Sequence, residues 1–238
     1  MRLALETSTD RASVAFGSSA ADARTRELTG ARRHAAGLVP MIADLLREAG
    51  ATLDDVTTLV LSDGPGSFTG LRVGASVAKA LVQARRLPLW IAPSLLVRAS
   101  GVARPGALVL AVANALRGEL YAAAYRFDGG AVRVALAPSV YPPDALMASA
   151  DRPDILVGEV PDLAGRALER WAGRTLIQAP EGAPHARALL GLVGTPGGAT
   201  RVDAVAEWEP AYGRPAEAQA RWETAHGRPL PHPIGSPG

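Results

Sequence analysis

Hydrophobic positions along the chain fall into short continuous runs and into stretches with helical spacing. Near the N-terminus, two short apolar runs predict strands that meet at a turn around Thr9 and Asp10, and a third extended segment follows. Between residues 38 and 49, apolar residues recur three and four positions apart, which predicts a helix with Gly50 as its C-cap. The first half ends with a strand at TTLVLSD, a helix at LRVGASVAKALVQARR and a strand at PLWIAP.

The same order of elements then returns. Three successive strands are predicted at ALVLAVANA, GELYAAAYRF and AVRVALAP, followed by a helix at PDALMAS, a strand at DILVGE and a helix at PDLAGRALERWAG. Two β-β-β-α-β-α passes predict a duplicated α/β fold with a mixed sheet in each half. We expect lobes at residues 1–104 and 105–212, with the last segment of the second packing back on the first, and a flexible tail at 213–238 that is rich in Pro, Gly and Ala.

Composition narrows the class of protein. Hydrophobic residues make up 48% of the chain and charged residues 20%, as in ordinary globular proteins. The chain has no cysteine, which excludes a disulfide framework, a thiolate zinc site and a cysteine nucleophile. The apolar stretch before Glu6 is only three residues long, and no run approaches eighteen, so we expect a cytoplasmic protein without a membrane segment. The net charge is +2 with no basic run, which does not favour a nucleic-acid surface.

The segment SDGPGSFTGLRVG, residues 62–74, is a glycine-rich loop between a strand and a helix. It lacks the Gly-Lys pair of a P-loop, the third glycine of a dinucleotide fingerprint and the flanking glycines of a nucleophile elbow. The residues favour a turn that shapes the start of a helix near Leu71, capped by Ser67 or Thr69. Direct phosphate binding at the helix N-terminus is the alternative. We assign the loop-shaping role to Gly64, Pro65, Gly66, Ser67, Thr69 and Gly70.

Several stretches together resemble one known family. GPGSFTGLRVG followed by AKAL is similar to the signature of the TsaB (YeaZ) family of bacterial tRNA threonylcarbamoyladenosine biosynthesis proteins. LALETST resembles the family's opening strand and turn, and RRHAAGLVPMIADLL its first long helix. ANALRGELYAAAYR resembles its central hairpin and EWEPAYGRP its C-terminal piece, so the resemblance covers residue 3 to about residue 215.

The resemblance implies a fold and a role. The fold is that of the sugar-kinase/Hsp70/actin superfamily, with two RNase H-like lobes. The role is that of a non-catalytic subunit, which binds and activates a TsaD-like transferase and is joined by a TsaE-like ATPase. Together they form N6-threonylcarbamoyladenosine at position 37 of tRNAs that read codons beginning with A. The resemblance then implies that the partner holds ATP and metal and that this chain has no cofactor of its own. It also implies that the chain meets tRNA only within the complex and forms a homodimer when it is alone.

Positions that carry metal ligands in TsaD-like relatives hold other residues here. Two histidines are expected after the strand at PLWIAP, where this chain has Pro93 and Val97. The four histidines are His34, His185, His226 and His232, and no two of them share a helical turn. This spacing makes a histidine-based metal centre improbable, and we assign no metal ligand and no catalytic residue.

Further substitutions fall at the first turn and in the central hairpin. Glu6 stands where the family usually has aspartate. We favour a structural role, in which the Glu6 carboxylate accepts N–H bonds from Ser8 or Thr9, over a role in binding magnesium. In the hairpin, Asn114 and Leu116 stand where the family has aspartate and often arginine, while Arg117, Glu119 and Tyr121 remain.

The two helices of the first half are expected to serve a partner interface. The first presents a leucine-rich stripe and the second presents small residues, and in the family these helices pack against the equivalent pair of the partner. A stripe of this kind also covers the chain's own sheet, which is the structural alternative. For His34, a hydrogen bond across the interface and a local cap stay equally open. The predicted interface comprises His34, Leu38, Met41, Ile42, Leu45, Leu46, Arg72, Ala75, Ala78, Lys79 and Val82.

Other function classes compete with this interpretation. An independent ATP-dependent kinase or ATPase of the same superfamily is the main alternative, although the loop has no phosphate-binding lysine. A tRNA-binding module is disfavoured by the low net charge. Peptidase activity would need Ser67 or Thr69 to find a histidine and an acid in space, and it is the least favoured.

Overall fold

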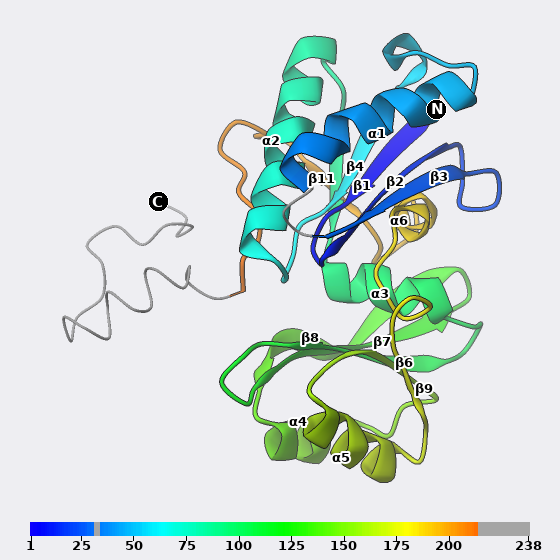
Figure 1. The fold of residues 1–238 in the computed structure, drawn as a ribbon. Helices are drawn as coiled ribbons and strands as arrows, with labels where there is room; N and C mark the ends of the chain where they lie inside the picture. The colour runs from blue at the N-terminus through cyan, green and yellow to red at the C-terminus, as the bar shows by residue number, and fades with distance from the viewer. Residues whose placement is uncertain (31–33, 214–238) are drawn as a thin grey trace, which may run out of the picture.

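Two sheets, each covered by a pair of helices, lie on either side of a central helical layer (Figure 1). The computed structural model describes residues 1–30 and 34–213 of the chain. In that part, no helix is long and apolar enough to cross a bilayer. The predicted tail lies outside the described residues from residue 214 onward.

The first sheet has six strands in the order β11-β5-β4-β1-β2-β3. Strands β1, β4 and β5 are parallel, and β2 and β3 continue the sheet from β1 as an antiparallel meander. β11 comes from the far end of the chain and pairs antiparallel with β5. The strands are β1 (Arg2–Glu6), β2 (Arg11–Gly17), β3 (Arg24–Thr29), β4 (Thr58–Ser62), β5 (Leu89–Ala92) and β11 (Thr200–Val202).

The second sheet repeats this plan with five strands in the order β10-β9-β6-β7-β8. Strands β6, β7 and β8 form the antiparallel meander, and β6, β9 and β10 run parallel. The strands are β6 (Leu108–Asn114), β7 (Leu120–Asp128), β8 (Ala131–Tyr141), β9 (Ile155–Glu159) and β10 (Leu176–Ile177). The predicted duplicated α/β fold is therefore confirmed.

Helices fill three layers around the sheets. On the outer face of the first sheet lie α1 (His34–Glu48) and α2 (Phe68–Arg85), and on the outer face of the second lie α4 (Pro143–Ser149) and α5 (Asp162–Ala172). Between the sheets lie α3 (Ser94–Val102) and α6 (Ala186–Leu192). A short 3₁₀ turn (Leu53–Asp55) precedes β4.

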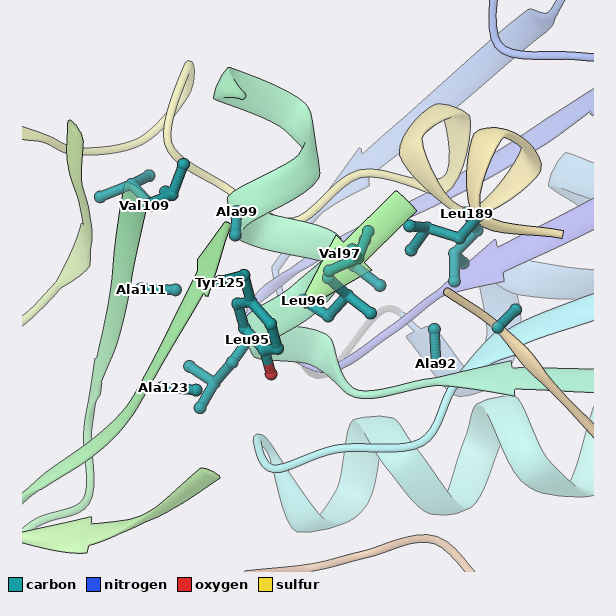
Figure 2. Packing of buried hydrophobic residues seen from close by; sticks show 14 of the residues in the cluster. Ala92, Leu95, Leu96, Val97, Ala99, Val109, Ala111, Ala123, Tyr125 and Leu189 are labelled. Atoms are coloured by element: carbon teal, nitrogen blue, oxygen red, sulfur yellow. The ribbon is translucent and has the colours of Figure 1, made fainter. Parts of the chain in front are cut away.

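The largest buried cluster lies in the middle layer and joins the two halves. Figure 2 shows Leu95, Leu96 and Val97 of α3 between residues from both sheets. Ala92 and Leu189 approach from the side of the first sheet, and Val109, Ala111, Ala123 and Tyr125 from the second. Because α3 buries side chains toward both sheets, the halves share one core.

The outer helices of the first sheet also bury their apolar stripes within the chain. Leu38, Leu45 and Ala78 have no exposed surface, and the exposure of the other stripe residues is 6% or less. The sequence assigned seven such residues to a partner interface, and that assignment is wrong, because side chains packed on their own sheet cannot reach a partner. The seven are Leu38, Met41, Ile42, Leu45, Leu46, Ala75 and Ala78.

This packing predicts that substitutions at buried and exposed positions of α1 change the free energy of unfolding by different amounts. Leu45→Ala should lower the free energy of unfolding by about 2–5 kcal/mol, because it opens a cavity under the helix. Val39→Ala, at a side chain that is 57% exposed on the same helix, should change it by less than about 0.5 kcal/mol. Urea denaturation of both variants measures the difference. Equal effects would place Leu45 on a surface and restore the original assignment.

Candidate functional site

The glycine-rich loop brings α2 unusually close to the turn after β1. A Cβ atom at Gly66 would stand 2.2 Å from the carbonyl oxygen of Ser8, and one at Gly70 would stand 2.1 Å from that of Thr7. A Cβ at Gly74 would stand 2.4 Å from the Thr7 hydroxyl. Any larger residue at these positions would push the helix away from the sheet.

The helix begins earlier than its sequence indicates. α2 starts at Phe68 rather than near Leu71, so Thr69 and Gly70 belong to its first turn. Ser67 is the N-cap residue, and its hydroxyl accepts a hydrogen bond from the Gly70 amide at 3.2 Å. The amide of Ser67 itself donates to the carbonyl of Ser8 at 2.7 Å. The loop therefore uses its cap and its first amide for bonds within the chain.

The other residues of the loop meet the middle layer and the C-terminal segment. Gly64 has φ of +107°, and its carbonyl accepts a hydrogen bond from the Ser94 amide at 2.8 Å. The carbonyl of Pro65 accepts one from the Ser94 hydroxyl. A Cβ at Gly64 would stand 2.2 Å from the carbonyl oxygen of Ala211. The loop is thus closed in by its own chain on three sides.

A buried polar cluster lies beneath the loop, where β1 and β4 end. Glu6 is fully buried, and its Oε1 accepts a hydrogen bond from the Ser8 amide at 2.6 Å, so Ser8 is the donor of the two alternatives expected from the sequence. Burial raises the pKa of Glu6, while the nearby hydroxyls of Ser8 and Ser62 and the charge of Arg98 oppose the shift. Within the described residues, Glu6 Oε2 and the hydroxyls of Ser8 and Ser62 have no hydrogen-bond partner.

Asp63 and Tyr125 extend this cluster toward the second sheet. Burial raises the pKa of Asp63 to about 6. Burial also raises the pKa of Tyr125, with a further contribution from the Asp63 charge. Burial thus makes ionisation less favourable for both the Asp63 carboxyl and the Tyr125 hydroxyl. In the described part of the chain, no three His, Cys, Asp or Glu side chains come together as metal ligands.

Arg98 of α3 is the charged link between the halves. Its side chain is 3% exposed, and it donates to Glu159 Oε2 at 3.1 Å and to the carbonyl of Gly182 at 2.6 Å. Burial lowers the pKa of Arg98, and the charges of Glu159 and Glu6 act in the opposite direction. The sequence analysis missed this pair, because its members are 61 positions apart.

The positions matched to metal-binding histidines serve packing instead. Pro93 is the N-cap residue of α3, and Val97 is completely buried in the central cluster. His185 caps α6, where its Nδ1 accepts from the Arg187 amide at 3.0 Å and its Nε2 lies 2.9 Å from Glu27 Oε1. The side chain of His34 and the whole of His226 and His232 lie outside the described residues.

The central hairpin carries an exposed turn. Asn114 Oδ1 accepts a hydrogen bond from the Leu116 amide at 2.8 Å. Leu116 and Arg117 have positive φ angles of 63° and 52°, and Leu116 is 62% exposed. Glu119 and Tyr121 follow on the strand side of this turn, and Tyr121 is buried.

The remaining interface candidates lie on the side of α2 that faces the C-terminal segment. The Arg72 guanidinium lies 4.1 Å from the ring centre of Phe68 and 5.8 Å from that of Tyr212. Lys79 forms an ion pair with Glu209 at 3.2 Å. Val82 is half-buried against the core of the first sheet. The segment WEPAY packs on the first lobe, because Pro210 is buried and Trp208 packs against that cluster.

Comparisons with known proteins agree with this geometry. Residues 28–169, more than half of the chain, match the family model described as "TsaD: tRNA N6-adenosine threonylcarbamoyltransferase". The chain is 36% identical over 128 residues to the tRNA threonylcarbamoyladenosine biosynthesis protein TsaB of Escherichia coli. That match covers 53% of this chain and 55% of the relative, so the chain spans about half the length of this curated protein.

Two solved structures match over nearly their whole length. YeaZ from Pseudomonas aeruginosa is 33% identical with a TM-score of 0.68, and the match covers 81% of this chain and 90% of that one. A protein described as similar to peptidase YeaZ from Pseudomonas aeruginosa is 30% identical with a TM-score of 0.71. This second match covers 90% of this chain and 99% of the other.

The close approach of α2 predicts opposite effects at two helical glycines. Gly70→Ala should destabilise the fold by about 1–3 kcal/mol, because its Cβ meets the backbone of Thr7. Gly101→Ala in α3 should be neutral or stabilising by up to about 1 kcal/mol, since no atom lies within 4 Å of its Cβ position. Thermal unfolding compares the two. A Gly70→Ala variant as stable as Gly101→Ala would contradict the packing role of the loop.

The half-buried Asp63 predicts a pH dependence with a defined sign. Its folded pKa of about 6 lies above the ordinary 3.8, so its contribution to stability is present below pH 4 and is lost as pH rises through 6. Asp63→Asn should therefore be more stable than the parent chain by about 1–3 kcal/mol at pH 7.5, with the difference vanishing near pH 4.

Denaturation curves at several pH values test this expectation. The exposed Asp151 provides the control, because the free energy of unfolding of Asp151→Asn should change with pH in the same way as that of the parent chain. If the free energy of unfolding of Asp63→Asn shows the same pH dependence as that of the parent chain, the pKa of Asp63 is not raised in the folded protein.

Proposed function

The chain belongs to the TsaB (YeaZ) family, and on this premise we propose that it takes part in forming N6-threonylcarbamoyladenosine at position 37 of tRNAs that read codons beginning with A. In this proposal the chain is a non-catalytic subunit that binds and activates a TsaD-like transferase. A TsaE-like ATPase joins them, ATP and metal are held by the transferase, and tRNA meets the chain only in the complex. Without the transferase the same surface pairs two copies of the chain.

The proposal of a subunit rather than a transferase is supported by two kinds of observation. The solved YeaZ structures match along almost all of their length, whereas the transferase family model stops at residue 169. The two positions matched to metal ligands are a proline cap and a fully buried valine, and neither side chain carries a ligating atom.

The observation that carries the binding role is the outward side of α1 and α2. These helices expose residues that are small or apolar, a set we call the outer helix face. Solvent-facing sides of surface helices normally carry charges, and an uncharged side of this size is typical of an interface. The outer helix face comprises the exposed Ala35, Ala36, Val39, Pro40 and Ala43 of α1, the exposed Ser76, Ala80 and Ala84 of α2 and the half-buried Val73 and Val77, and the exposed Arg47 borders it at the end of α1.

Another surface helix of the same chain shows the ordinary pattern. The outward side of α5 carries Arg166 and Arg170 together with Asp162 at its start, beside an exposed Leu163. The lack of charge on the outer helix face is therefore a property of that surface and not of the chain. This face replaces the buried residues that the sequence assigned to the interface, on the same two helices.

A reconstituted reaction tests the proposal directly. Unmodified tRNA is incubated with the transferase, the ATPase, ATP and a threonylcarbamoyl donor, with and without this chain, and the modified nucleoside is quantified by mass spectrometry. The chain alone should form no product, and its addition should raise the rate of the transferase. Product from the chain alone, or an unchanged rate on adding it, would contradict the proposal.

Matched glutamate variants locate the surface. Val39 on α1 and Val134 on β8 are both 57% exposed, so Val39→Glu and Val134→Glu add the same charge at equally accessible positions. Val39→Glu should weaken transferase binding about tenfold or more, because it would bury an unpaired charge in the interface. Val134→Glu should bind as the parent chain does. Equal affinities in a titration would exclude the outer helix face.

A further inference from the structure

The C-terminal segment after β11 lies along one side of α2, and we call residues 203–213 the brace. Lys79 fixes its first half, since Lys79 Nζ donates to the carbonyl of Ala206 and to Glu209 Oε1, both at 3.2 Å. The same ammonium lies 5.9 Å from the ring centre of Trp208. The chain's single lysine is thus committed to an internal contact.

Aromatic and cationic side chains fix the second half of the brace. The rings of Tyr212 and Phe68 lie 4.8 Å apart, and the Arg72 guanidinium lies over both. The Tyr212 hydroxyl donates to Glu209 Oε2 at 3.3 Å, which connects this group to the Lys79 contact. Phe68, Arg72 and Lys79 share one side of α2 by their spacing, so the brace runs along that side.

The end of the brace reaches both lobes. The Ala211 amide donates to the Asp63 carbonyl at 2.7 Å, at the start of the glycine-rich loop. Gly213 has φ of +73°, and a Cβ there would stand 2.7 Å from the Tyr121 ring and 2.9 Å from Pro65. Tyr121 belongs to β7 of the second sheet, whereas Pro65 belongs to the loop that starts α2. The brace therefore touches the second lobe and the start of α2 at a single residue.

We propose that the brace couples the second lobe to the outer helix face, because it holds the start of α2 in register with Tyr121. A shift of Tyr121 must either carry Gly213 and Pro65 with it or break their contact. Movement of Pro65 displaces the first turn of α2, and Phe68 and Arg72 pass that displacement along the helix through the brace. Tyr212 and Gly213 are positioning residues in this scheme, and its consequence for partner binding rests on the proposed function.

Two substitutions loosen the brace with matched controls. Gly213→Ala places a methyl group against Tyr121 and Pro65, whereas Gly173→Ala adds one at a similar φ of +64° with no atom within 4 Å. Tyr212→Ala removes the ring that packs against Phe68 and Arg72, whereas Tyr212→Phe keeps the ring and loses the hydroxyl with its polar contacts to Glu209 and Arg72. Thermal unfolding first establishes that each variant of the full chain is folded.

Hydrogen exchange and partner affinity are then measured on the same proteins. Gly213→Ala and Tyr212→Ala should speed amide exchange in residues 64–72 about fivefold or more, while both controls match the parent chain. The dissociation constant for the transferase should rise about fivefold in the same two variants. If the two alanine variants exchange amide hydrogens in residues 64–72 at the rate of the parent chain, the proposed role of the brace is wrong.

The remaining outcomes are also decisive. Faster exchange with an unchanged dissociation constant would show that the brace holds the loop but does not act on the outer helix face, which overturns the coupling. A parent chain that fails to bind the transferase would count against the proposed function instead. The exchange of residues 64–72 would still decide whether the brace exists.

Discussion

The contact between α2 and the turn after β1 is the constraint on which the first lobe depends. The carbonyls of Thr7 and Ser8 lie too close to the backbone of Gly66 and Gly70 for a side chain to fit between them. Glycine at both positions therefore allows this approach. Ala75 and Ala78 pack against the sheet, and Ser76, Ala80 and Ala84 are exposed on the opposite side of α2. The same contact aligns Phe68 and Arg72 with the C-terminal segment.

The loop resembles a phosphate-binding loop because both need glycine for close approach of backbone. Here the approaching group is the chain's own turn: the Ser67 amide donates to the Ser8 carbonyl, while the Ser67 hydroxyl accepts from the Gly70 amide in the first turn of α2. Beneath the loop, burial favours neutral Glu6 and Asp63. Arg98 supplies the one strong charged link across the described junction, through Glu159. This ion pair connects α3 to the end of β9 in the second sheet.

Sequence patterns predicted the two β-β-β-α-β-α passes, a cap at Ser67 or Thr69 and a bond to Glu6 from the Ser8 or Thr9 amide, since each depends on neighbours close in the chain. They did not predict the helices α3 and α6 of the middle layer or the short strands β10 and β11. They could not tell whether the Leu38–Leu45 stripe covers the chain's own sheet or a partner, because both need the same apolar spacing. The start of α2 was misplaced because Gly70 looks like loop, although its position inside the helix allows the contact with Thr7. The links of Lys79 to Glu209 and Arg98 to Glu159 join residues too distant in sequence for any local pattern.

The central claim is that α2 packs closely on the first sheet and that the outer helix face binds a partner. Its most direct test is the hydrogen-exchange footprint of the unmodified chain with and without the transferase subunit. The account predicts protection in residues 35–47 and 73–84 and none in the charged helix at residues 162–172. Protection confined to the second lobe, or to the glycine-rich loop alone, would contradict it.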